Sequence, residues 1–87
     1  MAQVWIPALM RDLTGGRQMV EVSGQTVGAV IEALEHAYPG IEARLCEGGR
    51  IRPVIAAYVD GRVAQLGLRE PVTLNSEIQF LPVLSGG

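Results

Sequence analysis

The chain contains no lysine, a single cysteine (Cys46) and a single histidine (His36) among its 87 residues. One cysteine excludes an internal disulfide and a cysteine metal cluster. The sequence also shows no pair of carboxylates at a catalytic spacing and no nucleophile with a base beside it, which are the arrangements that acid–base and nucleophilic catalysis need. We therefore interpret Cys46 as a bystander, assign no catalytic side chain, and predict that the chain is not an enzyme.

Basic runs and long apolar runs are missing as well. The seven cations are scattered arginines and the net charge is −2, so the chain has no electrostatic footprint for binding nucleic acid. No apolar stretch approaches the roughly 20 residues that span a bilayer, and the N-terminus lacks the charged and then apolar plan of a signal peptide. We therefore expect a cytoplasmic protein without a nucleic-acid or membrane partner.

What the chain does contain is enough apolar sequence for one compact core. Hydrophobic residues make up 48% of it and charged residues 18%, a composition typical of a single globular domain. A domain of this length buries only about 60–65% of its unfolded surface. We therefore expect one core and no deep, enclosed active site.

The hydrophobic pattern predicts strands, then one helix, then further strands. Thr26 is suited to cap a helix over residues 26–37, in which apolar residues recur every three or four positions, and residues 41–45 are expected to add a short second turn. Strand patterns occur at residues 3–6, 18–22, 53–59, 62–64 and 77–82. This order predicts an α+β fold with one sheet packed on one helix.

The segments between these elements are expected to be loops. Residues 7–16 form a connection longer than the usual hairpin loop of about two to five residues, which suggests a functional or packed loop. Gly48 and Gly49 indicate a flexible loop. Residues 65–75 are expected to be irregular, with Leu68, Val72 and Leu74 as apolar anchors.

The chain ends on Gly86-Gly87, directly after the last apolar strand pattern. Because glycine has no Cβ, two of them let a backbone lie extended in a narrow channel and leave the final carbonyl open to attack. Taken alone, two terminal glycines are better explained by a frayed end, in which small residues tolerate disorder. If the terminus does react, the absence of lysine prevents isopeptide bonds between copies of this chain, although compositional drift towards arginine accounts for the missing lysine as well.

Several motifs of this chain resemble the MoaD/ThiS family of ubiquitin-like sulfur carriers. They lie at residues 6–16, 24–27, 38–41, 58–61 and 80–87, and the last includes Pro82 shortly before the terminal Gly-Gly. The resemblance covers essentially the whole chain. It implies a β-grasp domain over residues 1–82, with a mixed four- to five-stranded sheet packed on one main helix, and a flexible C-terminal tail over residues 83–87.

The same resemblance implies the chemistry of the tail. An E1-like adenylating enzyme would use ATP to convert the Gly87 carboxylate to an acyl-adenylate, and a persulfide or sulfide donor would then displace AMP to leave a thiocarboxylate. Val83, Leu84, Ser85 and Gly86 would carry that group into the active sites of partners. The implied partners are this activating enzyme and a sulfur-accepting synthase, and the chain itself would bind no cofactor.

A carrier of this kind needs a docking face, for which we predict Trp5, Tyr58 and Leu81. If Val4 and Ile6 point into the core, Trp5 points outward. The family fold places the last strand beside the first. An exposed apolar patch usually marks an interaction site, and Trp and Tyr are typical interface anchors. The alternative is that Trp5 only covers the sheet edge or packs on loop 7–16.

Three functions stay open on the sequence. The first is a sulfur carrier for cysteine or molybdopterin synthesis, in the latter case as the non-catalytic small subunit of a synthase; the pattern is closer to the cysteine-synthesis carriers, and thiamine thiazole synthesis is least favoured. The second is a ubiquitin-like modifier that is conjugated through Gly87 to lysines of target proteins. The third is a β-grasp binding module whose tail is inert.

Overall fold

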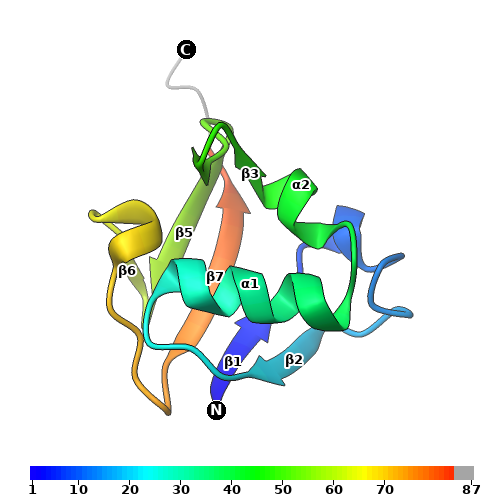
Figure 1. Cartoon of the computed structure of the whole chain (residues 1–87), viewed down its shortest axis with the longest axis horizontal. Helices are drawn as coiled ribbons and strands as arrows, with labels where there is room; N and C mark the ends of the chain where they lie inside the picture. The colour runs from blue at the N-terminus through cyan, green and yellow to red at the C-terminus, as the bar shows by residue number, and fades with distance from the viewer. Residues whose placement is uncertain (84–87) are drawn as a thin grey trace.

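The computed structural model describes residues 1–83, which form a five-stranded sheet, a two-stranded hairpin and two α-helices (Figure 1). The strands are β1 Ala2–Trp5, β2 Met19–Val22, β3 Cys46–Glu47, β4 Arg50–Ile51, β5 Ile55–Val59, β6 Arg62–Val63 and β7 Glu77–Pro82. The helices are α1 Val27–Ala37 and α2 Ile41–Leu45, with short 3-10 turns η1 Ala8–Met10 and η2 Gly67–Arg69. The predicted α+β fold is confirmed, with a sheet of five strands.

The sheet is mixed because its first and last strands pair in parallel. The strand order is β2-β1-β7-β5-β6, and β1 runs parallel to β7 with Val4 opposite Ile78. The other pairs in this sheet are antiparallel. The expected position of the last strand beside the first is thereby confirmed.

The core lies between the sheet and α1. Val4 and Ile78 are fully buried from the sheet side, and Val30 and Leu34 are fully buried from the helix side. Figure 1 shows α1 and α2 in front of the same face of the sheet. The alternating strand residues therefore point towards the helices, and their neighbours point to the opposite face of the sheet.

The ends of α1 are fixed by side chains that bind free backbone groups. Thr26 has extended dihedrals, and its Oγ1 accepts a hydrogen bond from the Ala29 N–H at 3.1 Å, as predicted for the helix cap. At the other end, the Glu35 carboxylate accepts hydrogen bonds from the N–H groups of Gly40 and Glu42 at 2.9–3.1 Å. Glu35 therefore ties the end of α1 to the start of α2.

Two expectations about loops are corrected by the structure. Gly48 and Gly49 are the turn of a hairpin between β3 and β4 rather than part of an open loop, and both have positive φ. Leu74 was expected to anchor the segment before β7, but its side chain is 74% exposed, whereas Val72 is buried and Leu68 packs against the core. A single apolar residue in an irregular segment has no periodicity from which its direction follows.

None of the helices in residues 1–83 has the length and apolar character required to cross a membrane.

The Glu35 contact makes a pH-dependent prediction. The N–H groups of Glu42 and then Gly40 hold the pKa of the Glu35 carboxyl below its ordinary value of 4.5. Because the folded-state pKa is lowered, this stabilisation is present above pH 4.5 and is lost as the pH falls through the lowered value. We expect Glu35→Gln to lower Tm at pH 7, and this difference to disappear in acid below the lowered pKa, as measured by thermal unfolding.

Glu32→Gln is the matched control, because Glu32 lies exposed on the same helix and makes no side-chain hydrogen bond within residues 1–83. It should leave Tm unchanged at both pH values. An equal loss of Tm for the two variants would show that the contact with the start of α2 is not the cause.

Candidate functional site

The face of the sheet opposite the helices carries the predicted docking residues. Trp5 on β1 lies opposite Gln79 on β7, which in turn lies opposite Tyr58 on β5. Two residues further along β7, Leu81 lies opposite Ala56 on β5. Trp5 is 38% exposed and Leu81 is 44% exposed, so apolar side chains of three neighbouring strands share this outer face.

Trp5 and Leu81 line one apolar groove of about 580 Å³. The floor of this groove is formed by strands β1, β7 and the start of β5, and its wall by the η1 segment that follows β1. The lining residues are Trp5, Ile6, Pro7, Ala8, Leu9, Met10, Arg11, Val54, Ile55, Gln79, Phe80, Leu81 and Pro82. We refer to this surface as the outer groove.

The structure brings together two of the three predicted docking residues. Tyr58 lies on the same face but does not line the outer groove, because Gln79 stands between it and Trp5. Sequence reasoning missed Leu9, whose side chain is 90% exposed on η1. The sequence indicated only that the loop over residues 7–16 is unusually long, and loop length does not show which of its residues is exposed at the groove.

Polar groups lie at the margins of the outer groove and fix its shape. The Trp5 indole N–H donates to the Glu77 carboxylate at 3.1 Å, which sets the orientation of the ring. Arg11 Nε donates to the Ile6 carbonyl oxygen at 3.1 Å, which holds the arginine against the end of β1. The indole therefore presents its apolar surface in a fixed position, an arrangement typical of an interface anchor.

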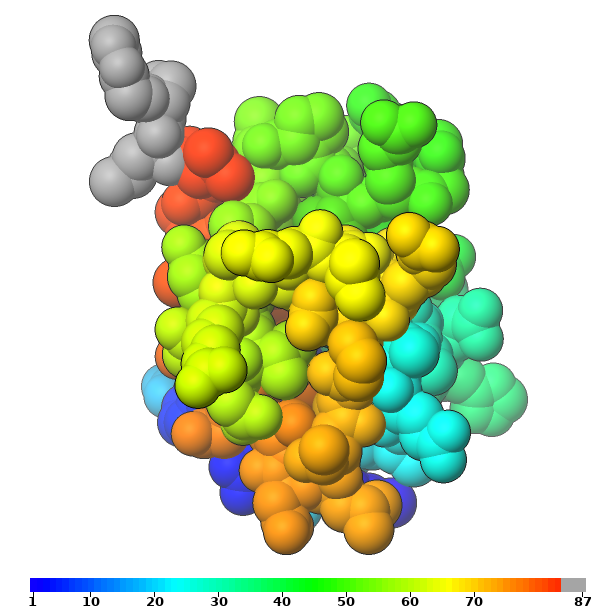
Figure 2. All heavy atoms as spheres, turned by 90° about the vertical axis from the view of Figure 1, so that its left-hand side faces the viewer, coloured from blue at the N-terminus to red at the C-terminus, as the bar shows by residue number. Residues whose placement is uncertain are grey.

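The predicted tail begins at the end of the outer groove. The Val83 N–H donates to the Val54 carbonyl oxygen at 2.9 Å, so pairing with the chain before β5 continues one residue beyond β7. Leu84, Ser85, Gly86 and Gly87 lie outside the residues that the structure describes. In Figures 1 and 2, the end of β7 reaches the same end of the molecule as the β3–β4 hairpin.

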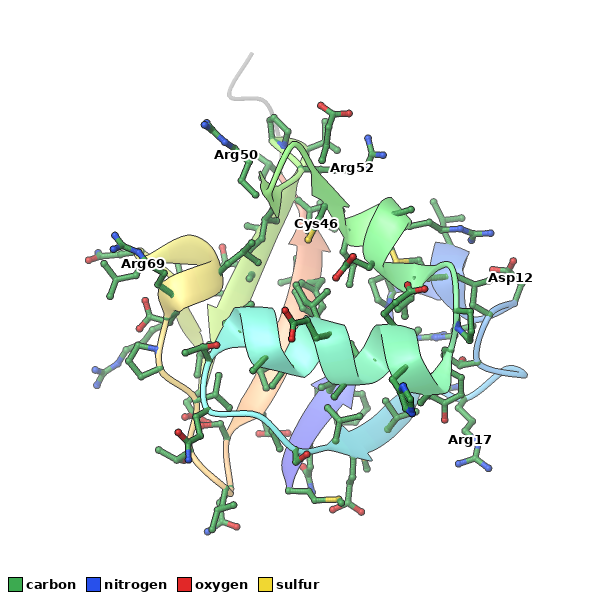
Figure 3. All side chains as sticks on the ribbon, viewed as in Figure 1. Asp12, Arg17, Cys46, Arg50, Arg52 and Arg69 are labelled. Atoms are coloured by element: carbon green, nitrogen blue, oxygen red, sulfur yellow. The ribbon has the colours of Figure 1, made fainter. Side chains whose placement is uncertain are left out.

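Two arginines lie at this end of the molecule. Figure 3 shows Arg50 and Arg52 near the end of β7. Arg52 forms an ion pair with Glu47 at 2.9 Å and donates to the Ala43 carbonyl oxygen, whereas Arg50 is exposed and makes no side-chain hydrogen bond to residues 1–83. The surface near the end of β7, from which the negatively charged C-terminus would extend, is therefore not acidic.

Cys46 lies in a second, more polar hollow of about 410 Å³ beside α2. Burial, with the nearby Glu42 carboxylate, raises the pKa of its thiol. A raised pKa keeps the thiol protonated, and the thiol is a much weaker nucleophile than the thiolate. Within residues 1–83, no group of three or more His, Cys, Asp and Glu side chains is placed to hold a metal ion.

A five-stranded mixed sheet with a parallel central pair, packed on one helix, defines a ubiquitin-like β-grasp protein. The model of the ThiS family matches residues 4–87. The chain belongs to the ThiS family, and the resemblance inferred from its sequence is confirmed. The sulfur carrier protein CysO of Mycobacterium tuberculosis is 35% identical over 89 aligned residues, which cover 97% of this chain and 96% of CysO.

Solved structures agree with this assignment. The crystal structure of Mycobacterium tuberculosis CysO superposes with a TM-score of 0.91 at 32% identity, over 97% of this chain and 100% of that chain. The Amycolatopsis orientalis BexX/CysO complex contains a chain with a TM-score of 0.92 and 32% identity, and both chains are covered completely. The small archaeal modifier protein SAMP1 of Methanosarcina acetivorans gives a TM-score of 0.80 at 25% identity, over 99% of this chain and 95% of that chain.

The outer groove leads to a prediction about docking. Leu81→Asp places a charge in the groove at a half-exposed site, so the fold is kept while burial of the groove against a partner becomes costly. We expect this change to weaken binding to a partner protein that covers the groove by about tenfold or more. Titration calorimetry with the purified partner measures this effect.

Leu74→Asp is the matched control, because Leu74 is a more exposed leucine that does not line the outer groove. It should bind like the unmodified chain. Equal weakening by both variants would point to a general effect of the added charge and would remove the groove from the interface.

Proposed function

We propose that this chain is a sulfur carrier whose Gly87 carboxylate is adenylated by an E1-like enzyme and then converted to a thiocarboxylate. The chain is a protein cosubstrate, and its partners supply the catalytic groups. Its relatives named as sulfur carriers are similar to it along nearly their whole length. The proposal therefore rests on the family as well as on the geometry of the outer groove and the tail.

The observation that carries the proposal is the continuity between the outer groove and the start of the tail. Leu81 and Pro82 line the groove, and Val83 is tied to the residue before β5. The four residues that follow span about 14 Å when extended. A partner that covers the groove therefore has the terminal carboxylate within reach of its own active site while the folded domain stays outside.

The proposed chemistry is likewise divided between this chain and its partners. A carboxylate is a poor electrophile, so a partner must transfer AMP from ATP to the Gly87 oxygen and release pyrophosphate. Hydrosulfide then attacks the acyl carbon, the C–O bond to AMP breaks, and AMP leaves with a proton released to solvent. The product is a terminal thiocarboxylate, whose sulfur is uncrowded because Gly86 and Gly87 have no side chains.

The likeness to CysO favours a place in cysteine synthesis over one in molybdopterin synthesis. In the Amycolatopsis orientalis BexX/CysO complex, CysO is bound to a second protein, which supports a sulfur-accepting partner for this chain as well. ATP would be held by the activating enzyme rather than by this chain. We assign the protein to the cytoplasm, where ATP is available and the single thiol of Cys46 stays reduced.

The likeness to SAMP1 keeps a second candidate function in view. A modifier would use the same activation, but its acyl group would pass to a lysine amine of another protein. The absence of lysine from this chain is compatible with that role and equally with a carrier. The fate of the activated terminus distinguishes the two functions.

The decisive experiment is mass spectrometry of the intact protein after incubation with ATP, sulfide and the E1-like enzyme of the same source. We expect the chain to gain the mass difference between one sulfur and one oxygen atom. A chain that lacks Gly87 should gain nothing. If the full chain is unchanged by an enzyme that loads another carrier, the proposal is wrong, and a lysine-linked adduct in cell lysate would favour the modifier.

A further inference from the structure

Leu9 is an exposed apolar side chain on a segment that is held in place by an element from elsewhere in the chain. It lies on η1, which forms the wall of the outer groove, and its side chain is 90% exposed. Among the exposed large hydrophobic residues of the described chain it has the highest exposed fraction. Exposure on this scale gives the folded monomer almost nothing from burial.

Arg44 on α2 provides the contacts that hold this wall. Its Nη1 donates to the Leu9 carbonyl oxygen at 3.0 Å, and its Nη1 and Nη2 donate to the two carboxylate oxygens of Asp12 at 3.0 Å each. The Arg44 guanidinium thus holds the loop at two points, Leu9 and Asp12. Figure 3 shows Asp12 beside α2, so the loop is attached to the helix layer while Leu9 lines the groove on the opposite face.

The Arg44 contacts fix the position of the loop more than they add to the stability of the fold. Both partners of the ion pair are exposed, with side-chain exposures of 43% for Arg44 and 61% for Asp12, and exposed pairs add little to the stability of a fold. The loop has further attachments, since Met10 and Thr14 are buried and Thr14 Oγ1 donates to the Arg17 carbonyl oxygen. Loss of Arg44 therefore removes the contact at the Leu9 carbonyl without unfolding the loop.

We propose that Arg44 and Asp12 are positioning residues that hold Leu9 as a preorganised docking anchor for the adenylating enzyme. This inference rests on the proposed function. A segment whose backbone is already ordered spares the complex the entropy cost of immobilising the loop that carries the Leu9 side chain, which lowers the dissociation constant without any new contact.

The adenylating enzyme is the expected occupant because of where the groove ends. The wall that carries Leu9 and the strand end at Pro82 line the same groove, and only four residues separate Val83 from the reacting end of Gly87. A protein that covers the groove up to Pro82 is therefore within about 17 Å of the terminal carboxylate. It must present an apolar pocket to Leu9 and bind ATP close to the groove.

The test is a steady-state assay of thiocarboxylate formation by the activating enzyme, with KM for the carrier and kcat measured separately. We expect Leu9→Ala and Arg44→Gln each to raise KM by about tenfold with kcat unchanged. The double variant should be no worse than Leu9→Ala alone, because Arg44 acts through Leu9. Arg44→Lys should resemble Arg44→Gln, since an ammonium group cannot reproduce the two-pronged contact.

Arg17→Gln and Leu74→Ala are the matched controls and should leave KM unchanged, because neither residue lines the outer groove or contacts Arg44. If the wild-type chain is loaded while Arg44→Gln has an unchanged KM, or if the effects of Leu9→Ala and Arg44→Gln multiply, the positioning role is wrong. If the wild-type chain is not loaded at all, the proposed function itself fails and this inference fails with it.

Discussion

The parallel pairing of β1 with β7 is the contact on which the rest of the structure depends. It joins residues 3–5 to residues 77–79 and so closes the whole chain around one core, with Val4 and Ile78 buried side by side. Because β7 becomes a central strand, its outward side chains gain neighbours on both sides. Trp5 and Leu81 thus share one groove, and the strand that forms its floor continues directly into the chain terminus.

In the proposed function, this construction separates binding from reaction. The outer groove offers a partner apolar surface of fixed shape, with the Trp5 ring held by Glu77 and the η1 wall held by Arg44. The proposed reacting group, by contrast, is the carboxylate of a chain that ends on two glycines, which have no side chains. Burial raises the pKa of the Cys46 thiol, which disfavours its nucleophilic thiolate form. The carrier is therefore defined by a docking surface that ends close to the chain terminus rather than by a set of catalytic residues.

Sequence reasoning recovered the elements with strong periodicity and missed those defined by tertiary contacts. The helix capped by Thr26 and the strand that ends at Pro82 follow from apolar spacing and capping chemistry. The β3–β4 hairpin has two-residue strands, too short to show alternation. The outward direction of Trp5 and Leu81 followed from strand alternation, but the Leu9 carbonyl is held by Arg44, which lies 35 residues away in the chain, and no local pattern encodes such a contact.

The most direct test of the central claim, that the folded domain docks while the tail reacts, is a competition experiment with a chain that ends at Ser85. This shortened chain keeps the outer groove but lacks Gly86 and Gly87. We predict competitive inhibition of loading of the full chain, with loss of inhibition when Leu81→Asp is added. If the shortened chain fails to inhibit while the full chain is loaded, the binding energy lies in the tail and the docking role of the groove is contradicted.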